Sequence, residues 1–588
     1  MEQPTRLFDL PYYQLAQYPQ QKAFNTKLNG EWESVTIAEY IDRANQVSRA
    51  LLHLGVGPDD KIAVITKVNR IEWHQLDMGM SQLGAVNVPL YATLSAKDYA
   101  YILNHSDAQY CFVSDQELLD KVRSVQHETQ LKGIYTFDTD TDGDTWESFM
   151  ALGSENGNQE QVDTLKTQVK ADDLASIIYT SGTTGTPKGV MMSHANLVYT
   201  ATLCKDILAL DGPGKRVLSY LPISHIFERL TTYYYAYMGF EIYFAESIEK
   251  LADNLKEVQP HFIPIVPRLL EKVYDKILAK GQELKGLKKK LFFWAVDLAE
   301  RFEPNQNQGA WYNWQLKKAD KLIFSKWRAV FGGQIEFMVS GSAPLQDRLI
   351  KAFTAAGLPI MEGYGMTESA GVISINDARG GNLRLKTVGK TVKGVTVSLA
   401  DDGEILIQGP NVLQGYYKNP KKTAEAIQNG FFHTGDIGEF DDDGFLQITD
   451  RKKEIFKTSG GKYIAPAMIE NLLKQSGFIE QVVVIGENRR MPAALIQPNH
   501  EFIQEWAQKH DYTLESLHTD SRVIERTQEE IDRYNESLGK WEKIKRFELT
   551  EDVWSIEAGH LTPTLKPKRK VIKEKYAHLY QKIYGEKL

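Results

Sequence analysis

Residues 179–190, YTSGTTGTPKGV, combine three glycines, four threonines, one serine and a single lysine in twelve positions. Backbone N–H groups and hydroxyls in such a stretch can surround a phosphate while the lysine neutralises its charge. The candidate phosphate ligands are Thr180, Ser181, Gly182, Thr183, Thr184, Gly185 and Lys188. A Walker loop needs four residues between its first glycine and Gly-Lys-Ser/Thr, and that spacing is absent here. The stretch is therefore another kind of phosphate loop or an ordinary surface turn.

The residues around this loop predict a fixed support for it. ASIIY, before the loop, is an apolar run typical of a buried strand, and VMMS after it can form a second strand. The following HANLVYTATLC predicts a helix with Ser193 at its N-cap. A loop held between two buried strands is suited to gripping an anionic ligand.

The wider chain predicts an α/β architecture that changes character near residue 450. Residues 35–135 alternate helical patterns with apolar runs such as KIAVIT and GAVNVPL, which predicts a largely parallel sheet. Residues 395–450 predict hairpins that turn at Asp-Gly, and mixed α and β patterns return afterwards. The polar stretch at 450–453 is the candidate domain boundary.

Composition excludes several classes of protein. The chain of 588 residues is too long for a single core, and its 42% hydrophobic and 25% charged residues are typical of a soluble globular protein. A formal net charge of -8 argues against general nucleic-acid binding. The two cysteines imply no disulfide framework, and no signal peptide or membrane-spanning run is found. We therefore expect a cytoplasmic protein.

Further segments occur in the order found in the adenylate-forming superfamily. After the phosphate loop come SYLPISHIFER, MEGYGMTES, FFHTGDIG, TDRKKEIFKTSGGKYIAP and GHLTPTLKPKR. Over about residues 30–575 the chain thus resembles acyl- and aryl-CoA synthetases, peptide-synthetase adenylation domains and firefly-type luciferases. The resemblance implies a large N-terminal adenylation domain, residues 1–450, with stacked α/β sheets and a β-rich subdomain at about 385–450. It also implies a small, mobile C-terminal α+β domain, residues 451–588, with a hinge near Lys453.

The resemblance implies an ATP site that uses Mg²⁺. Besides the phosphate loop, the implied nucleotide ligands are Gly363, Tyr364, Gly365, Thr367, Asp436, Arg451 and Lys566. Tyr364 offers a flat ring to the purine, Glu368 supplies an oxygen ligand to Mg²⁺, and Asp436 accepts the ribose hydroxyls. Without the resemblance, Glu368 is typical of a surface carboxylate and Asp436 of a turn residue.

The implied catalytic residues are Lys566, His225, Thr184 and Glu368. In the family, the corresponding lysine contacts the carboxylate and the α-phosphate, and the histidine lies near both. The alternatives are a packed or capping role for His225 and the start of a basic terminal helix for Lys566.

The second half-reaction of the family uses CoA after the C-terminal domain has rotated about its hinge. The implied thiolation face carries Lys457, Ser459, Gly460 and Gly461. The alternative for RKK, residues 451–453, is a basic solvated turn between the domains. In VSGSAPL, which resembles the wall shared by adenine and acyl group, Ser342 stands where many relatives have glycine.

The segment after His225 indicates the class of substrate. Peptide synthetases anchor the substrate amine with an aspartate there, whereas this chain has none between Asp211 and Asp253. LPISHIFER and the segment 281–331 resemble long-chain fatty-acyl-CoA synthetases in particular. The prediction is an ATP-dependent ligase whose small-molecule partners are a fatty acid, ATP and CoA. The alternatives are a fatty acyl-AMP ligase that loads a carrier protein and a non-catalytic homologue at membranes.

Segment 281–331 mixes aromatic and basic side chains. Its aromatic residues include Phe292, Phe293, Trp294, Trp311, Trp314 and Trp327, and they alternate with lysines. This pattern is as typical of a peripheral contact with a bilayer as of an amphipathic pair of surface helices.

Overall fold

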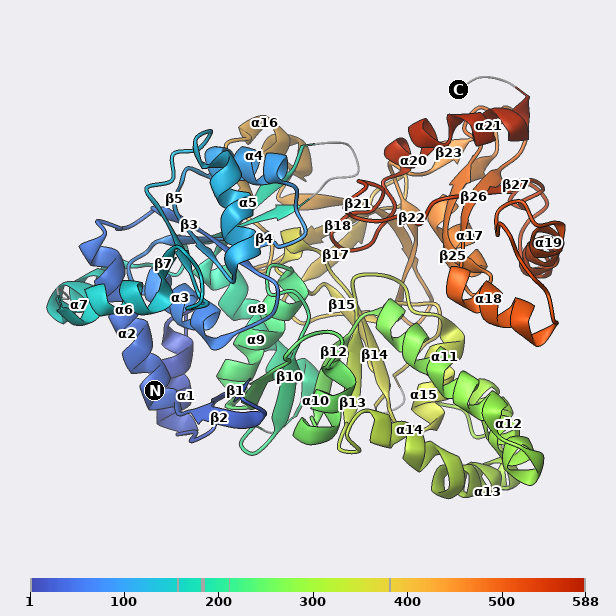
Figure 1. The fold of residues 1–588 in the computed structure, drawn as a ribbon, viewed down its shortest axis with the longest axis horizontal. Coiled ribbons are helices and arrows are strands. Elements are labelled where there is room, and N and C mark those ends of the chain that lie inside the picture. The colour runs from blue at the N-terminus through green and yellow to red at the C-terminus, as the bar shows by residue number, and fades with distance from the viewer. Residues whose placement is uncertain (1–2, 156–157, 181–185, 211, 380–381, 586–588) are drawn as a thin grey trace.

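The computed structural model describes residues 3–155, 158–180, 186–210, 212–379 and 382–585. Among these residues, two large sheets, mainly parallel, form the N-terminal part of the molecule, and the C-terminal elements gather at one end (Figure 1). The α/β fold class with a β-rich subdomain and a small α+β domain is thereby confirmed.

The first large sheet is built from strands that lie far apart in the sequence. Its order is β16 (Lys390–Thr391), β15 (Ser374–Asn376), β14 (Ile360–Tyr364), β13 (Phe337–Ser340), β12 (Phe262–Ile265), β10 (Arg216–Ser219), β11 (Glu241–Phe244), β1 (Phe24–Leu28) and β2 (Glu31–Val35). Helices α10 (Leu251–Val258), α11 (Pro267–Glu283), α12 (Gly286–Glu300), α14 (Ser325–Val330) and α15 (Asp347–Ala355) share one hydrophobic core with it. The carboxyl end of β14 carries the EGYGMTE segment toward the candidate site.

The second large sheet carries the phosphate-loop candidate. Its order is β19 (Gly415–Tyr416), β9 (Lys188–Ser193), β8 (Leu174–Thr180), β4 (Val86–Tyr91), β3 (Lys61–Thr66), β5 (Ala108–Val113), β6 (Gly133–Thr136) and β7 (Asp144–Thr145). One face packs on α2 (Ile37–His53), α3 (Ile71–Gln82) and α6 (Trp146–Glu155), and the other on α4 (Ala96–Ser106) and α5 (Gln116–Gln126). The two strands expected around the loop are therefore present as an antiparallel pair.

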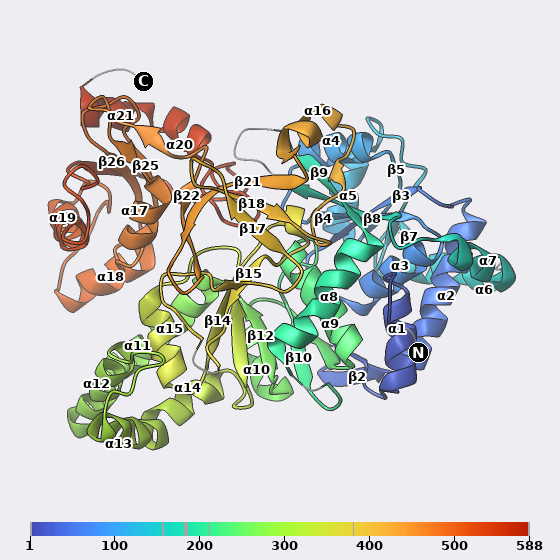
Figure 2. The same cartoon turned by 180° about the vertical axis from the view of Figure 1, so that it is seen from behind.

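Two buried helices lie between the large sheets. Helices α8 (His194–Leu208) and α9 (Ile226–Met238) share a core with strands of both sheets and with α1 (Asp9–Gln17) (Figure 2). The expected cap of α8 is confirmed, because Ser193 Oγ accepts a hydrogen bond from the backbone N–H of Asn196. Both sheets are thus tied to the same pair of helices.

A smaller sheet leads to the C-terminal domain. It contains β17 (Thr396–Leu399), β18 (Glu404–Gln408), β21 (Phe431–Phe440) and β20 (Ile427–Gln428), with β22 (Leu446–Arg451) paired to β21. The hairpins expected at Asp402-Gly403 and Asp443-Gly444 are present. Beyond β22, the chain forms the hairpin of β23 (Phe456–Lys457) and β24 (Tyr463–Ile464) and a sheet of β25 (Ile479–Ile485), β26 (Ala493–Pro498) and β27 (Phe547–Leu549). Helices α17 (Pro466–Leu473), α18 (His500–Lys509), α19 (Ser521–Asn535), α20 (Arg569–Lys575) and α21 (Ala577–Tyr584) complete this domain.

A buried ion pair connects α9 to α3, and the same guanidinium reaches the second sheet through Ser176. Arg229 Nη2 lies 2.9 Å from Asp77 Oδ1, and the Arg229 guanidinium also donates to Ser176 Oγ of β8 and to the Tyr233 hydroxyl. Tyr233 in turn donates to Asp77 Oδ2 at 2.6 Å. A buried guanidinium is tolerated only when charge and hydrogen bonds compensate its loss of water. The network therefore fixes the helix that follows His225 against the strand that leads into the phosphate loop.

We expect Asp77→Ala to destabilise the N-terminal domain by about 3–5 kcal/mol, because it leaves the Arg229 charge buried without its carboxylate partner. Urea unfolding followed by circular dichroism measures the shift. Exposed Asp140 provides the control, and Asp140→Ala should change stability by less than about 0.5 kcal/mol. Equal effects of the two substitutions would mean that the pair does not support the fold.

Candidate functional site

The ends of the phosphate-loop candidate are fixed by a strand pair. Thr180, the last residue of β8, lies opposite Lys188, the first residue of β9. Ser181, Gly182, Thr183, Thr184 and Gly185 lie outside the described residues. Burial lowers the pKa of Lys188, and the positive charges of Lys422 and Lys453 lower it further, while Glu368 opposes them. Lys188 is therefore a cation that a nearby anion would stabilise.

The EGYGMTE segment runs from β14 into a short 3-10 helix, η2 (Thr367–Ser369). A Cβ on Gly365 would lie 1.9 Å from the carbonyl oxygen of Gly371, so this glycine is needed by the chain's own turn. A Cβ on Gly363 would meet only ordinary contacts of 3.8 Å and beyond. Gly365 is thus explained by packing, whereas the space around Gly363 is compatible with a ligand.

Tyr364 makes a contact that the sequence did not predict. Its hydroxyl donates to Asp436 Oδ2 at 2.8 Å, and the phenol is almost completely buried. The Tyr364 hydroxyl therefore holds the carboxylate expected to bind ribose. Burial and the Asp436 charge raise the pKa of Tyr364 well above its usual value, so the hydroxyl remains a donor.

Asp436 and Arg451 face each other across two paired strands. They are register partners in β21 and β22, and Arg451 Nε lies 3.1 Å from Asp436 Oδ1. Asp436 is 4% exposed, whereas the Arg451 side chain is 45% exposed. This arrangement fixes the carboxylate while leaving part of the guanidinium open to solvent.

Lys566 lies in a compact loop just before α20. Its backbone N–H bonds to Thr562 Oγ1 at 3.0 Å, and Thr562 N–H bonds to the Lys566 carbonyl oxygen at 2.8 Å. Lys566 has an exposed surface, but desolvation by the surrounding protein, together with the Arg451 charge, lowers its pKa to about 8. Asp436 acts in the opposite direction. A lysine from the C-terminal domain is thus brought into electrostatic range of the Asp436–Arg451 pair.

His225 belongs to the same group and also caps a helix. Its Nδ1 accepts a hydrogen bond of 3.1 Å from the backbone N–H of Phe227, at the start of α9. Burial lowers its pKa to about 4, assisted by the Lys566 charge, so the ring is neutral near pH 7. Since Nδ1 accepts, this hydrogen bond assigns the proton to Nε2, which makes Nε2 a donor. His225 therefore caps α9, as the alternative interpretation expected, and its ring also lies within electrostatic range of Lys566.

Two contacts dock the C-terminal domain in this position. Arg268 of α11 forms an ion pair with Glu480 of β25. In addition, Pro563 lines a small cavity of about 20 Å³ together with Tyr179 and Pro187, which flank the undescribed part of the phosphate loop. The Lys566 loop therefore lies against the N-terminal part of the molecule (Figure 1).

The structure does not bring the expected thiolation residues into this group. Lys457 lies on β23, and Ser459, Gly460 and Gly461 form the exposed turn before β24. Their backbone bonds reach Asn488 and Arg489 of the same domain, on the side of β22 away from the large sheets (Figure 1). Gly461 has φ of +77°, a conformation that favours glycine, so its residue type has a local structural reason.

Ser342 adopts a conformation that explains why glycine suits its position. Its φ is +70°, in the left-handed region. An L-residue there costs about 1–2 kcal/mol relative to its preferred conformations.

A magnesium ion would have a suitable carboxylate here. Among the described residues, no cluster of three or more His, Cys, Asp and Glu side chains forms a complete metal site. Mg²⁺ that bridges phosphates usually binds through one or two carboxylates, with substrate oxygens and waters as the other ligands. Half-buried Glu368, within electrostatic range of Lys188 and Arg451, fits that donor set.

The aromatic run after His225 is packed core. Tyr233, Tyr234 and Tyr235 are almost completely buried in the core shared by the two large sheets. The run therefore shapes α9 within this core. These rings thus give no support to a fatty-acid pocket.

Segment 281–331 divides into core and surface residues. Phe292 and Trp327 are buried, whereas Trp311 and Trp314 on α13 (Ala310–Ala319) are 69% and 50% exposed. In the described parts of the chain, no helix is long and apolar enough to cross a membrane.

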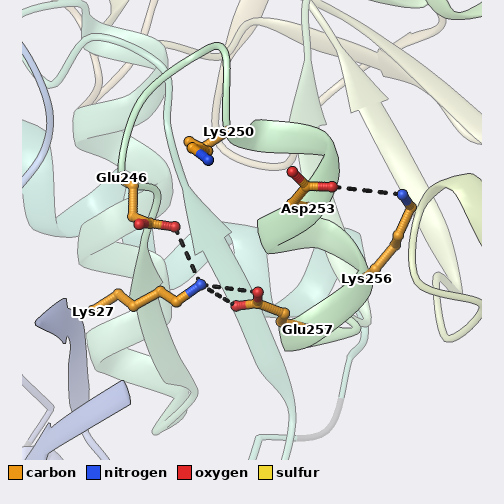
Figure 3. A pocket seen from close by; sticks show the side chains of 6 residues that line it. All are labelled: Lys27, Glu246, Lys250, Asp253, Lys256 and Glu257. Atoms are coloured by element: carbon orange, nitrogen blue, oxygen red, sulfur yellow. Dashed lines mark hydrogen bonds and ion pairs between the residues drawn. The ribbon is translucent and has the colours of Figure 1, made fainter. Parts of the chain in front are cut away.

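A charged surface pocket of about 300 Å³ lies away from this group. It is lined by Lys27, Glu246, Lys250, Asp253, Lys256 and Glu257 (Figure 3). Lys27 Nζ contacts Glu257 at 2.7 Å and Glu246 at 3.3 Å, so its charge is already compensated. This mixed and internally paired set offers no catalytic arrangement.

Sequence reasoning did not single out residues 411–416, which contact Glu368. Leu413 N–H bonds to the carbonyl oxygen of Glu368 at 2.9 Å, and the Tyr416 hydroxyl donates to Glu368 Oε1 at 3.1 Å. Nothing in the local sequence indicates a contact across 48 positions. In the sequence, the aromatic pair Tyr416-Tyr417 before a turn is the feature that could have drawn attention to this segment.

Comparisons with known proteins agree on the family. The family described as AMP-binding enzyme matches residues 12–417, and the AMP-binding enzyme C-terminal domain matches residues 453–587. The chain is 33% identical to a protein of Mycobacterium bovis named long-chain-fatty-acid–CoA ligase FadD15, covering 97% of this chain and 95% of that protein. It is also 33% identical to human long-chain-fatty-acid–CoA ligase 1, covering 94% of this chain and 83% of that protein.

Solved structures share the fold over almost the whole chain. The adenylation domain of a carboxylic acid reductase from Segniliparus rugosus, solved with AMP and a co-purified carboxylic acid, superposes with a TM-score of 0.77 at 20% identity. The match covers 99% of this chain and 94% of that one. A fatty acyl CoA synthetase of Mycobacterium tuberculosis gives a TM-score of 0.64 at 21% identity, covering 98% and 99%.

Proposed function

Because the chain belongs to the AMP-binding enzyme family, we propose that it is an ATP-dependent long-chain fatty-acid–CoA ligase. In the first half-reaction, the fatty-acid carboxylate attacks the α-phosphate of ATP, acyl-AMP forms and pyrophosphate leaves. In the second, the thiol of CoA attacks the acyl carbon, the thioester forms and AMP leaves. The names of the full-length relatives support the substrate class. The observation that carries the proposal is the gathering of Lys566 with His225, Asp436 and Arg451, from both domains.

The charges of this group suit the adenylation step. The fatty carboxylate and the α-phosphate are both anions that repel each other as they approach. A preorganised ammonium at Lys566, with Lys188 near the phosphate loop, would offset that repulsion without rearrangement during the reaction. His225, neutral with its proton on Nε2, would donate a hydrogen bond rather than act as an acid. Asp436, held by Tyr364 and Arg451, would accept the ribose hydroxyls.

Mg²⁺, when bound at Glu368, would neutralise phosphate charge and orient the pyrophosphate leaving group. This chain's own contribution is a half-buried carboxylate fixed by the backbone and side-chain bonds of residues 413–416. Thr184 and the adjoining loop residues would bind the phosphates through their N–H groups and hydroxyls.

We further propose that the second half-reaction needs the C-terminal domain to rotate about Lys453. Lys453 follows β22, the last strand of the β-rich sheet, and the match to the C-terminal family begins at this residue. Rotation would exchange the Lys566 loop for the exposed turn of Ser459, Gly460 and Gly461, where CoA would approach. It must break the ion pair between Arg268 and Glu480.

The substrate proposal is tested by measuring pyrophosphate release across carboxylic acids, with and without CoA. Fatty acids of about 12–18 carbons should give higher kcat/KM than acetate, benzoate or amino acids, since each buried CH₂ contributes about 0.8 kcal/mol. Continuous turnover should require CoA. Full turnover with a carrier protein alone would instead indicate an acyl-AMP ligase, and a preference for acetate would refute the long-chain assignment.

Lys566→Ala should slow acyl-AMP formation by about 10²- to 10³-fold and leave thiolation of preformed acyl-AMP nearly unchanged, because it removes one preorganised charge from the first step. Single-turnover assays of each half-reaction measure the difference. In the wild type, kcat/KM for adenylation should also fall above pH 8, because a pKa lowered to about 8 means that the ammonium is lost there. Lys566→Arg should move that loss to higher pH.

Neighbouring lysines separate this role from general loss of charge. Lys570 is exposed, and its ion pair with Glu574, at 3.9 Å, is a surface pair of the kind that contributes little. Lys570→Ala and Lys568→Ala should therefore slow acyl-AMP formation only slightly. If all three alanine variants slowed adenylation alike, Lys566 would have no special role.

We also propose that α13 makes a peripheral contact with anionic membranes. Trp311, Trp314 and Lys318 recur at spacings of three and four residues and so share one face of α13, and Leu322 follows in the π-helical turn Asp320–Phe324. The two indole rings stack with centroids 5.0 Å apart, and Leu322 is 47% exposed. Exposed tryptophans beside lysines suit the interface of a bilayer that carries negative charge.

Replacing both Trp311 and Trp314 by serine should reduce binding to phosphatidylserine-containing vesicles at least tenfold in sedimentation assays. Trp541 offers a matched control, because it is also 50% exposed and also lies beside a lysine, Lys462, at 5.0 Å. Trp541→Ser should leave vesicle binding unchanged. Equal binding by all three proteins would refute the contact.

A further inference from the structure

One segment contacts both sides of the candidate phosphate site. Residues 411–416, which we call the strap, run from the β-rich region to β19 at the edge of the second sheet. At its first end, Asn411 Nδ2 donates to the carbonyl oxygens of Ser369 at 3.2 Å and of Val372 at 2.8 Å. Leu413 N–H donates to the carbonyl oxygen of Glu368 at 2.9 Å. The strap therefore fixes the backbone of the turn that carries Glu368.

The other end of the strap is fixed to the strand that leaves the phosphate loop. Tyr416 lies opposite Val190 in the pairing of β19 with β9, and Gln414 N–H donates to the carbonyl oxygen of Met191 at 3.1 Å. Thr423 Oγ1 accepts a bond of 2.9 Å from Tyr416 N–H. These bonds set the position of the Tyr416 side chain relative to Lys188, the first residue of β9.

The Tyr416 side chain contacts both parts of the candidate phosphate site. Its hydroxyl donates to Glu368 Oε1 at 3.1 Å, and Lys188 Nζ lies 5.4 Å from the centre of its ring. The side chain is 7% exposed, so neither contact is readily replaced by water. One rigid side chain thus touches the candidate metal ligand and the candidate phosphate cation.

A hydrogen bond to one carboxylate oxygen restricts how the whole group can turn. Because the Tyr416 hydroxyl binds Oε1 of Glu368, Oε2 is the oxygen left to bind another partner. The strap thereby fixes the direction in which Oε2 points. A ring face within about 6 Å of an ammonium attracts it through the ring's negative quadrupole. Tyr416 would therefore limit the motion of both charged groups before any ligand arrives.

We propose that Tyr416 is a positioning residue that presents Glu368 to Mg²⁺ and holds Lys188 toward the phosphates of ATP. This inference rests on the proposed function, which makes Glu368 the metal-binding carboxylate. Tyr416 contacts neither the metal nor the nucleotide in this role, and its effect passes through the two residues that it touches.

The test separates the hydroxyl from the ring by measuring ATP binding to the full-length protein by calorimetry, with Mg²⁺ and with EDTA. Tyr416→Phe should weaken ATP binding about tenfold in Mg²⁺, the size expected for one lost hydrogen bond to a carboxylate, and leave it unchanged in EDTA. In the same variant, a higher Mg²⁺ concentration should be needed for half-maximal ATP binding. Tyr416→Leu, which also removes the ring, should weaken binding under both conditions.

Tyr417 supplies the matched control. It is the next residue, and its hydroxyl contacts Asp107 at 3.1 Å instead of Glu368. Tyr417→Phe should bind ATP like the wild type under both conditions. If Tyr416→Phe behaved like Tyr417→Phe, or lost affinity equally with and without Mg²⁺, the positioning role would be wrong.

Glu368→Gln distinguishes this inference from the proposal on which it rests. Loss of Mg²⁺-dependent ATP binding in Glu368→Gln, together with normal binding in Tyr416→Phe, would reject only the role of Tyr416. Normal Mg²⁺-dependent binding in Glu368→Gln would reject the metal assignment itself, and the Tyr416 inference with it.

Discussion

The ion pair between Arg451 and Asp436 lies where three parts of the molecule meet. Asp436 belongs to β21 of the β-rich sheet and accepts a hydrogen bond from Tyr364, at the end of β14 in the nine-stranded sheet. Arg451 ends β22, two residues before Lys453, where the chain continues into the C-terminal domain. A movement of the C-terminal domain therefore begins two residues from Arg451, whose guanidinium is paired with the Asp436 carboxylate. Lys566 must arrive at this pair from more than one hundred residues further along the chain.

The rest of the N-terminal domain restricts the motion of the residues around this pair. Buried Arg229 holds α9 to Asp77 of α3 and to Ser176 of the second sheet, and His225 caps α9. The strap of residues 411–416 ties the Glu368 turn of one sheet to β9 of the other. The two large sheets are thus connected through packed helices on one side and through hydrogen bonds next to the candidate site on the other. A site formed from separate sheets can keep its geometry only if such connections resist independent movement of the sheets.

Sequence patterns predicted the parts of the fold that depend on local chemistry. The strands around residues 179–190, the Ser193 cap and the Asp-Gly hairpins were all confirmed, because apolar runs, caps and turn residues act over a few positions. The contacts of Tyr364 with Asp436 and of Tyr416 with Glu368 could not be predicted, since each joins segments separated by 48 or more residues. The place of the tyrosines after His225 could not be predicted from the sequence either. An aromatic run is typical both of a ligand pocket and of a core helix, and only the placement of α9 between two sheets decides for the core.

The charges around Lys566 indicate what kind of ligand this arrangement favours. The pKa of Lys566 is lowered first by desolvation and then by repulsion from the Arg451 charge, and the pKa of Lys188 first by desolvation and then by repulsion from Lys422 and Lys453. Asp436 offsets part of this repulsion but is already engaged by Arg451 and Tyr364. A polyanion such as the proposed MgATP, together with a carboxylate substrate, would supply the missing negative charge and would raise both lysine pKa values toward normal. By the same argument, departure of pyrophosphate would restore the repulsion between cations carried by different domains. The docked arrangement would then lose stability at the stage of the proposed reaction where the C-terminal domain has to rotate.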